Sequence, residues 1–192
     1  MQHIVLASTS PYRRQLLTRL QVPFDCVSPN VDETPNIAEP PDARALRLAE
    51  EKARAAADTH PHALIIGGDQ TISSGGTIFD KPGTTANAVR QLQYMSGREL
   101  HFFTAVAVFN APRNLIQQRL ISHRARFRHM SNDEIERYVQ KEPALNCAGG
   151  AQIEGLGVSL LETMEGGDPT AIIGLPLMHV AAMLRNAGIA IP

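Results

Sequence analysis

Two acidic and four cationic side chains stand out in this 192-residue sequence because of the segments that carry them. Glu33 lies in the segment VDET, and Asp69 ends the apolar run ALIIGGD. The cations are Arg13, Arg14, Lys52 and Lys81. Cations offset the charge of phosphates, and carboxylates bind the divalent metal ion that accompanies a polyphosphate. Together these residues predict a site for a metal-bound polyphosphate, although each one alone is also compatible with a structural or solvated role.

Asp69 and Lys52 carry the strongest local signals. In open α/β sheets ligands gather at the carboxyl ends of strands, where Asp69 is predicted to stand. The two glycines before it allow backbone or ligand to approach closely. On the helix predicted from Asp42 to Thr59, Lys52 lies on an apolar stripe, four residues after Leu48. Its amine therefore either extends to solvent or meets a buried anion.

The segment ASTSPYRRQLL predicts the start of the first helix. Ser10 is a suitable N-cap and Pro11 suits the first helical position. The positive end of a helix can also bind phosphate. Arg13 and Arg14 follow that end, and Arg14 stays open between a phosphate contact and a surface position.

The remaining pattern predicts an α/β fold (an α+β mixed sheet) in a single domain, residues 1–192, with two lobes around a deep cleft. The capping box of Ser131 and Glu134 begins one helix. Strands are expected over residues 3–8, 22–29, 63–69, 100–110, 119–130 and 156–162. Helices are expected to begin at Pro11 and to cover residues 42–59, 84–97, 132–141 and 175–188.

The bulk composition argues against a nucleic-acid or membrane partner. The formal net charge is −1, so no overall field attracts polyanions. The N-terminus does not resemble a signal peptide and no run is long enough to span a membrane, which predicts a cytoplasmic protein. Arg124, Arg126 and Arg128 alternate along a predicted strand and could form a nucleic-acid stripe, but a solvated strand face is the preferred interpretation.

The order of motifs resembles the Maf family of nucleotide pyrophosphatases along nearly the whole chain. The motifs are LASTSPYRR, VDET, RLAEEKA, IIGGDQ, DKP, MSG, KEP, AGG and GLPL. The resemblance implies a two-lobed fold and, in many members, a homodimer. It also implies a cytoplasmic house-cleaning enzyme that uses Mg²⁺ or Mn²⁺ to cleave a nucleoside triphosphate into the monophosphate and pyrophosphate.

Site residues follow from matching the family motifs position by position. Asp69 matches the catalytic acid and, with Glu33, holds the metal. Substrate specificity falls to Tyr12, Gln70 and Glu154. The phosphate-binding positions are Ser8, Arg13, Lys52 and Lys81.

The specificity positions are most similar to those of the subgroup acting on 7-methyl-GTP. Methylation at N7 makes guanine cationic, so the ring of Tyr12 can stack on it with a cation–π energy of about 0.5–2 kcal/mol. Glu154 can accept the guanine N1–H and N2–H. The subgroup commonly has tryptophan at the position of Tyr12. Asp80 replaces a usual glycine, and Ala151 replaces an aromatic residue that would wall the base pocket.

Two alternatives stay open at this point. One is the same enzyme acting on dTTP or UTP, against which Tyr12 and Glu154 argue. The other is a non-enzymatic regulator of septum formation, for which the arginine stripe would be the binding feature.

Overall fold

A computed structural model describes residues 2–192 and confirms the α/β class. Over that range the chain forms five α-helices and one mixed sheet of seven strands. The helices are α1 (Pro11–Thr18), α2 (Pro41–Ala55), α3 (Thr85–Met95), α4 (Asn132–Lys141) and α5 (Leu177–Asn186). The strands are β1 (Ile4–Ala7), β2 (Asp25–Val27), β3 (Leu64–Ser74), β4 (Thr77–Phe79), β5 (Glu99–Asn110), β6 (Leu115–Phe127) and β7 (Leu161–Gly166). The strand order is β2-β1-β3-β5-β6-β7, with β4 paired to β3.

The described chain divides into two compact units. Unit 1 comprises the segments up to Gln70, Thr104–Ile121 and Asp168–Pro192. Unit 2 comprises Thr71–Phe103 and Ser122–Gly167. Strands β3, β5 and β6 contribute residues to both units. The single domain over 1–192 and the deep cleft stay predictions.

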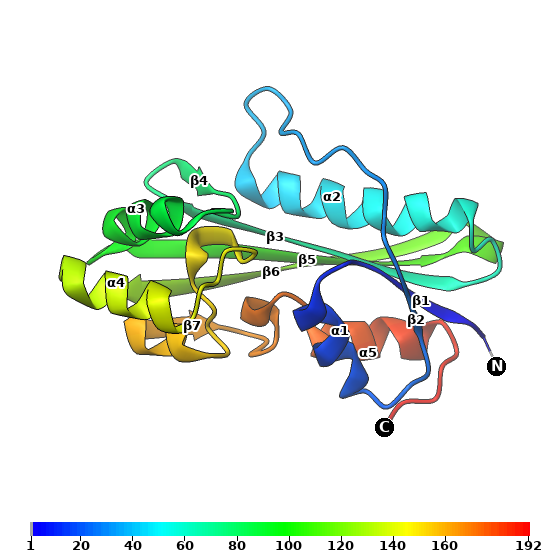
Figure 1. The fold of residues 1–192 in the computed structure, drawn as a ribbon. Helices are drawn as coiled ribbons and strands as arrows, with labels where there is room; N and C mark the ends of the chain where they lie inside the picture. The colour runs from blue at the N-terminus through cyan, green and yellow to red at the C-terminus, as the bar shows by residue number, and fades with distance from the viewer. Residues whose placement is uncertain (1) are drawn as a thin grey trace. The chain divides into compact units, whose positions relative to one another are not determined.

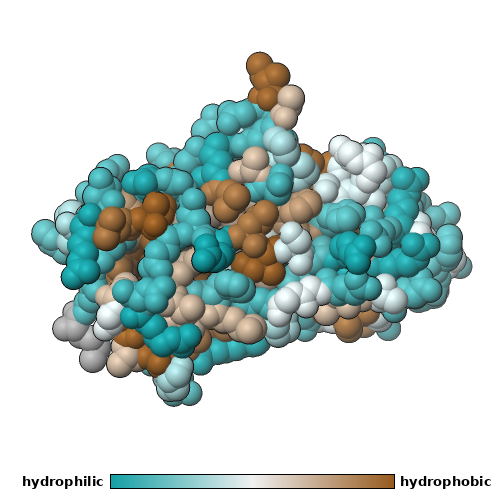
Figure 2. Space-filling model, turned by 180° about the vertical axis from the view of Figure 1, so that it is seen from behind, coloured by the Kyte–Doolittle hydropathy of each residue, from teal (hydrophilic) through white to brown (hydrophobic). Residues whose placement is uncertain are grey.

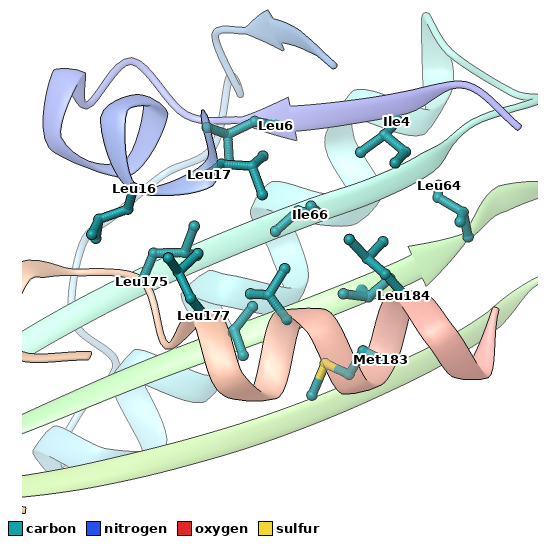
Figure 3. Close-up of a cluster of buried hydrophobic side chains, with 13 residues drawn as sticks. Ile4, Leu6, Leu16, Leu17, Leu64, Ile66, Leu175, Leu177, Met183 and Leu184 are labelled. Carbon is teal, nitrogen blue, oxygen red and sulfur yellow. The ribbon is translucent and has the colours of Figure 1, made fainter. Parts of the chain in front are cut away.

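Unit 1 is a helix–sheet–helix sandwich. Its strands β2, β1 and β3 are parallel. Helix α2 covers one face of these strands, and α1 and α5 cover the other (Figure 1). Every residue of β1 is buried, as expected for a parallel strand with helices on both sides. The core on the α1 and α5 side joins Leu6, Ile66, Leu17 and Leu184 (Figure 3).

Local sequence signals account for the starts of α1 in unit 1 and α4 in unit 2. The Ser10 hydroxyl accepts the N–H of Arg13, with Pro11 at the first helical position of α1. In unit 2 the predicted capping box of Ser131 and Glu134 is confirmed at α4. Unit 2 also contains the β3–β4 hairpin, and α3 and α4 pack together there.

The strand predicted over residues 156–162 is wrong. Leu156–Leu160 form a 3₁₀ helix, and β7 begins only at Leu161, beside β6. The N–H groups of Leu156 and Gly157 donate to the Glu142 carboxylate, so they are not available to a strand ladder. β7 itself is almost entirely exposed, and its sequence LETMEG has no apolar alternation to indicate it.

The arginine stripe is a charge-paired surface within unit 2. Arg124 pairs with Glu165 at 2.6 Å, and Arg126 pairs with Glu162 at 3.4 Å. Arg128 lies just beyond β6 and pairs with Glu134 at 2.9 Å. All three guanidinium groups are therefore matched by carboxylates, which favours a solvated face over a polyanion-binding surface.

The segment of residues 28–40, between β2 and α2, carries Glu33 and extends outward from α2 (Figure 1). Figure 2 shows hydrophobic residues at the tip of this segment, in which Ile37 is fully exposed. Among the helices of residues 2–192, none is long and apolar enough to cross a membrane.

Candidate active site

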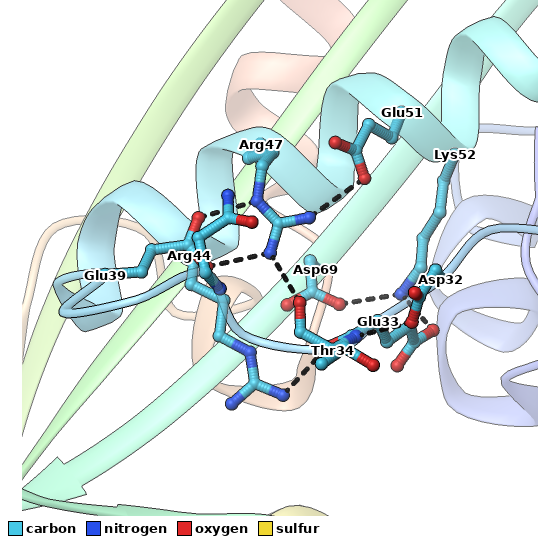
Figure 4. A network of polar contacts seen from close by, with 10 residues as sticks. Asp32, Glu33, Thr34, Glu39, Arg44, Arg47, Glu51, Lys52 and Asp69 are labelled. Carbon is cyan, nitrogen blue, oxygen red and sulfur yellow. Dashed lines mark hydrogen bonds and ion pairs between the residues drawn. The ribbon is translucent and has the colours of Figure 1, made fainter.

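Lys52 joins the two predicted carboxylates in unit 1. Its Nζ lies 2.7 Å from Glu33 Oε1 and 2.8 Å from Asp69 Oδ1 (Figure 4). The side chains of Lys52 and Asp69 are 7% and 11% exposed, whereas that of Glu33 is 52% exposed. Of the two alternatives for Lys52, the structure therefore shows the contact with a buried anion. Glu33 is thus the most exposed of the three side chains.

Close packing of α2 on β3 makes this contact reachable. A Cβ atom placed on Gly67 would lie 2.2 Å from the carbonyl oxygen of Ala49 and 2.7 Å from the nitrogen of Ala53, both in α2. Only glycine permits that approach, which confirms the expected close approach at Gly67, whereas a Cβ atom on Gly68 would meet only ordinary contacts from 3.5 Å. Lys52 precedes Ala53 in α2, and Asp69 follows two residues after Gly67 in β3.

Arg13 adds a second cation to the same cluster. It lies on the first turn of α1, and its Nε donates to the carbonyl oxygen of Gly174 at 2.9 Å. Burial lowers the pKa of Arg13, while the charges of Asp69 and Glu33 raise it. An arginine keeps its proton at neutral pH even so, and its charge is thus held beside both acids.

Ser8 and Tyr12 belong to the segment in which β1 ends and α1 begins. Ala7, the last residue of β1, is opposite Gly67 in the parallel β1–β3 pair, so Ser8 follows the carboxyl end of β1. Asp69 instead lies within β3, which continues to Ser74, so the prediction that Asp69 ends its strand is wrong. Ser8 is buried, and its Oγ accepts the N–H of Ser10 at 3.1 Å. Tyr12 is half-buried in the first turn of α1.

Two arginines of α2, absent from the sequence prediction, hold the acidic segment. Arg44 donates to the backbone carbonyl of Glu33 at 3.3 Å, and Arg47 donates to that of Thr34 at 3.3 Å. Arg47 also binds both carboxylate oxygens of Glu39, at 2.6 and 2.8 Å (Figure 4). The bidentate Arg47–Glu39 pair holds the 28–40 segment against α2, and this segment carries the Glu33 side chain that contacts Lys52. The only local signal was the pairing of Arg47 with Glu51 one turn away, which indicates nothing beyond a helix surface.

The Arg47–Glu39 pair predicts a pH-dependent contribution to stability. Hydrogen bonding to Arg47 lowers the pKa of Glu39 from 4.5 to about 2. Because the pKa is lower in the folded chain, the pair stabilises the fold above pH 4.5 and loses this effect as the pH falls towards about 2. Chemical denaturation of the wild type and Glu39→Gln should therefore show a difference in unfolding free energy at neutral pH that shrinks in this window.

Glu136→Gln, at an exposed position of α4, is the control for that comparison. It should follow the wild type at every pH. A difference between Glu39→Gln and the wild type that stays constant down to pH 2 would contradict the assignment of the pair.

Gln70 is engaged with backbone inside unit 1. Its Nε2 lies 2.9 Å from Thr104 Oγ1 and 3.1 and 3.0 Å from the carbonyl oxygens of Ala171 and Ile172. The Thr104 hydroxyl, fully buried, also donates to Ala171 at 2.9 Å. The backbone at Ala171 and Ile172, which accepts hydrogen bonds from Gln70, is followed closely by Gly174, whose carbonyl oxygen accepts from Arg13.

Lys81 and Glu154 belong to unit 2. Lys81 is exposed in the segment after β4 and precedes the buried Pro82. Glu154 is exposed in the turn that follows α4, and its pKa is raised, first by desolvation and then by the charge of Glu142. Of the nine predicted positions, the structure thus brings Arg13, Glu33, Lys52 and Asp69 into one cluster of unit 1.

The donor set fits a metal ion that is shared with a substrate. Among residues 2–192, no three His, Cys, Asp or Glu side chains gather in a group that could hold a metal. Mg²⁺, however, is usually bound by one or two carboxylates, waters and substrate phosphates rather than by a cage of protein ligands. Glu33 and Asp69, which meet at Lys52, supply two such carboxylates.

Comparison with known proteins places the chain in a family. The Maf family, described as "Maf-like protein", matches residues 3–187. The chain therefore belongs to the Maf family, which confirms the resemblance.

Its relatives are similar over nearly their whole length. A protein of Aromatoleum aromaticum is 52% identical over 98% of this chain and 97% of its own length. A protein of Nitrosospira multiformis is 49% identical, over 99% and 96%. A protein of Methylobacillus flagellatus is 48% identical, over 98% of each chain. Each of these three relatives carries the name 7-methyl-GTP pyrophosphatase.

Proposed function

We propose that this chain hydrolyses 7-methyl-GTP to 7-methyl-GMP and pyrophosphate, with Mg²⁺ or Mn²⁺. The broader activity, a pyrophosphatase acting on an acid anhydride, is supported by the names of the relatives. The contact of Lys52 with both Glu33 and Asp69, beside Arg13, supports this cluster as the site of the reaction. It combines two carboxylates with two fixed cations, as a metal-bound triphosphate requires.

Asp69 is the proposed general base. It is held within unit 1 by β3 and oriented by Lys52 at 2.8 Å. Its carboxylate orients a water molecule for attack on the α-phosphorus and takes the proton of that water. The departing pyrophosphate carries the electron pair of the broken anhydride bond.

Cations offset the charge that grows on the phosphates. Arg13 and Lys52 supply fixed positive charge in unit 1, and Ser8 lies at the start of α1, whose N–H groups and dipole favour an anion. The family resemblance assigns Lys81 to the phosphates as well. Glu33 and Asp69 would hold the metal ion, which supplies further charge neutralisation when bound.

Tyr12 and Glu154 are the proposed determinants of the base. The half-buried ring of Tyr12 suits stacking on the cationic 7-methylguanine ring. Glu154 accepts the N1–H and N2–H of guanine in a charge-assisted pair. Gln70 acts on specificity indirectly, because its amide nitrogen holds Thr104 and the backbone of Ala171 and Ile172.

Glu154→Gln tests the proposed base recognition. Gln keeps the shape but replaces one acceptor by a donor, which faces a guanine N–H. We expect the kcat/KM for 7-methyl-GTP to fall by about 10–100-fold, from the loss of a charge-assisted pair worth about 1.5–3 kcal/mol. The kcat/KM for UTP should change far less.

The measurement is pyrophosphate release from 7-methyl-GTP, GTP, dTTP and UTP, with Mg²⁺ and with Mn²⁺. Glu162→Gln on β7, which removes one partner of Arg126, is the control and should leave the ratios unchanged. A wild-type kcat/KM higher for UTP than for 7-methyl-GTP would overturn the proposed substrate.

The alternatives are not favoured. The dTTP and UTP enzyme lacks support from the names of the relatives. A polyanion-binding regulator of septum formation would need the arginine stripe, and its arginines are paired with glutamates. The cytoplasmic location and the homodimer stay predictions.

A further inference from the structure

The carboxylate of Glu142 is enclosed by a turn of the chain in unit 2. Glu142 follows directly after α4 and is half-buried. Its Oε1 accepts the N–H of Leu156 at 3.1 Å, and its Oε2 accepts the N–H of Gly157 at 3.1 Å. Both oxygens thus bind the backbone of one short segment, which we call the 152–157 turn.

Tyr138, one helical turn earlier in α4, extends this anchor. Its hydroxyl donates to Glu142 Oε2 at 3.2 Å and accepts the N–H of Gln152 at 3.0 Å. The Tyr138 side chain is buried, and burial is the main cause of its raised pKa, so the phenol keeps its proton and remains a donor. Three backbone N–H groups of the 152–157 turn therefore end on two side chains of the α4 region.

The turn fits tightly around the carboxylate. A Cβ atom on Gly155 would lie 2.2 Å from Glu142 Oε1, so a side chain there would displace the carboxylate from its present position. The carbonyl oxygen of Gln152 accepts the N–H groups of Gly155 and Gly157, at 3.1 and 3.0 Å. These bonds close the 152–157 turn on itself and fix its backbone on both sides.

Glu154 lies inside this turn, between two of the anchored positions. Its own side chain is exposed, and the anchored backbone fixes the point from which that side chain extends. The charge of Glu142 also acts on it, as a secondary cause of the raised pKa of Glu154. Glu142 therefore acts on the segment that carries Glu154 through backbone hydrogen bonds and on Glu154 itself through its charge.

We propose that Glu142 and Tyr138 are positioning residues for substrate choice, which hold the 152–157 turn so that Glu154 meets the base of the nucleotide. This inference rests on the proposed function, because it assigns the turn to recognition of the base. The competing explanation is a brace that serves the stability of unit 2 alone. The two differ in whether the preference among nucleotides changes.

The test uses Glu142→Gln and Tyr138→Phe in the full chain. Gln places an amide donor against backbone donors, and Phe removes only the hydroxyl from a buried ring. For each variant the kcat/KM ratio of 7-methyl-GTP to UTP should fall about tenfold, the effect of one lost hydrogen bond of about 1.4 kcal/mol. The change should lie in KM for 7-methyl-GTP, with kcat for UTP preserved. Glu136→Gln, exposed on the same helix, is the matched control.

A double variant separates positioning from bracing. If Glu142 acts through Glu154, then adding Glu142→Gln to Glu154→Gln should not lower the ratio further. Thermal unfolding of every variant shows whether folding is preserved, and Tyr138→Phe serves as the test if Glu142→Gln does not fold. An unchanged ratio in Tyr138→Phe, or an equal loss on all four triphosphates, would overturn the inference.

Failure of the proposed function gives a different pattern. In that case the wild type itself shows no preference for 7-methyl-GTP. The inference is then judged on whether Glu142→Gln and Glu154→Gln reorder the four triphosphates in the same way. Different reorderings, or none, would overturn it.

Discussion

Asp69→Asn is expected to reduce kcat for pyrophosphate release by about 10²–10⁴-fold, the usual contribution of a general base. Asn has nearly the same shape as Asp but cannot take a proton from water at neutral pH. Glu33 still pairs with Lys52 at 2.7 Å in this variant, so the cation stays in place. The loss should therefore appear in kcat more than in the affinity for the nucleotide.

The measurement is steady-state kinetics with 7-methyl-GTP, together with thermal unfolding and nucleotide binding of the variant. Asp58→Asn, at an exposed position just after α2, is the matched control and should retain wild-type kcat. Near-normal turnover of every triphosphate by Asp69→Asn would show that Asp69 is not the base.

Lys52→Met is expected to lower both stability and activity. Lysine and methionine have similar length, but Met removes the ammonium group that contacts the carboxylate of Asp69, which is 11% exposed, and leaves only the more distant charge of Arg13. Removing one partner of a buried ion pair typically destabilises a protein by about 3–5 kcal/mol. Activity should fall as well, because the same ammonium group offsets charge on the phosphates and orients Asp69.

The double variant Lys52→Met/Asp69→Asn distinguishes the two effects. Replacing Asp69 by a neutral amide removes the unpaired buried charge, so the double variant should be more stable than Lys52→Met. It should nevertheless stay inactive, since the proposed base and the cation that orients it are both gone. Denaturant titrations of the wild type, the two single variants and the double variant complete the cycle. A double variant no more stable than Lys52→Met would contradict the buried pair.

The sequence anticipated the parts of the site that depend on local pattern. Lys52 interrupts an apolar stripe at helical spacing, and Asp69 ends an apolar run after two glycines, so both signals arise within a few residues. Ser10 and Pro11 likewise predicted the start of α1. In each case the physical cause, burial of one face or capping of one end, acts between neighbours in the chain.

Contacts between distant segments could not be foreseen in this way. Arg13 donates to Gly174, 161 residues away, and Glu142 binds N–H groups 14 and 15 residues further on. A side chain that binds backbone carries no information about its partner's identity, because every residue type offers the same N–H or carbonyl. The strand wrongly expected at 156–162 has the same origin, since Glu142 takes the N–H groups that a strand would use.

Unit 1 thus contains a cluster of contacting charged side chains, for which we propose the chemical step. For recognition of the base we propose two separate side chains, Tyr12 and Glu154. Asp69 and Lys52 are fixed by close packing of α2 against Gly67, and Glu33 is carried on a segment fastened by Arg47. This division predicts that variants of the cluster lower turnover of all triphosphates. Variants of Tyr12 and Glu154 should change the preference among them.

The most direct test of the central claim is the hydrolysis of 7-methyl-GTP in isotopically labelled water with Mg²⁺, followed by mass spectrometry of the products. Attack by a water held at Asp69 on the α-phosphorus predicts label in 7-methyl-GMP and unlabelled pyrophosphate, with the reaction lost in Asp69→Asn. Release of orthophosphate, label in pyrophosphate, or no hydrolysis of 7-methyl-GTP by the wild type would contradict the account.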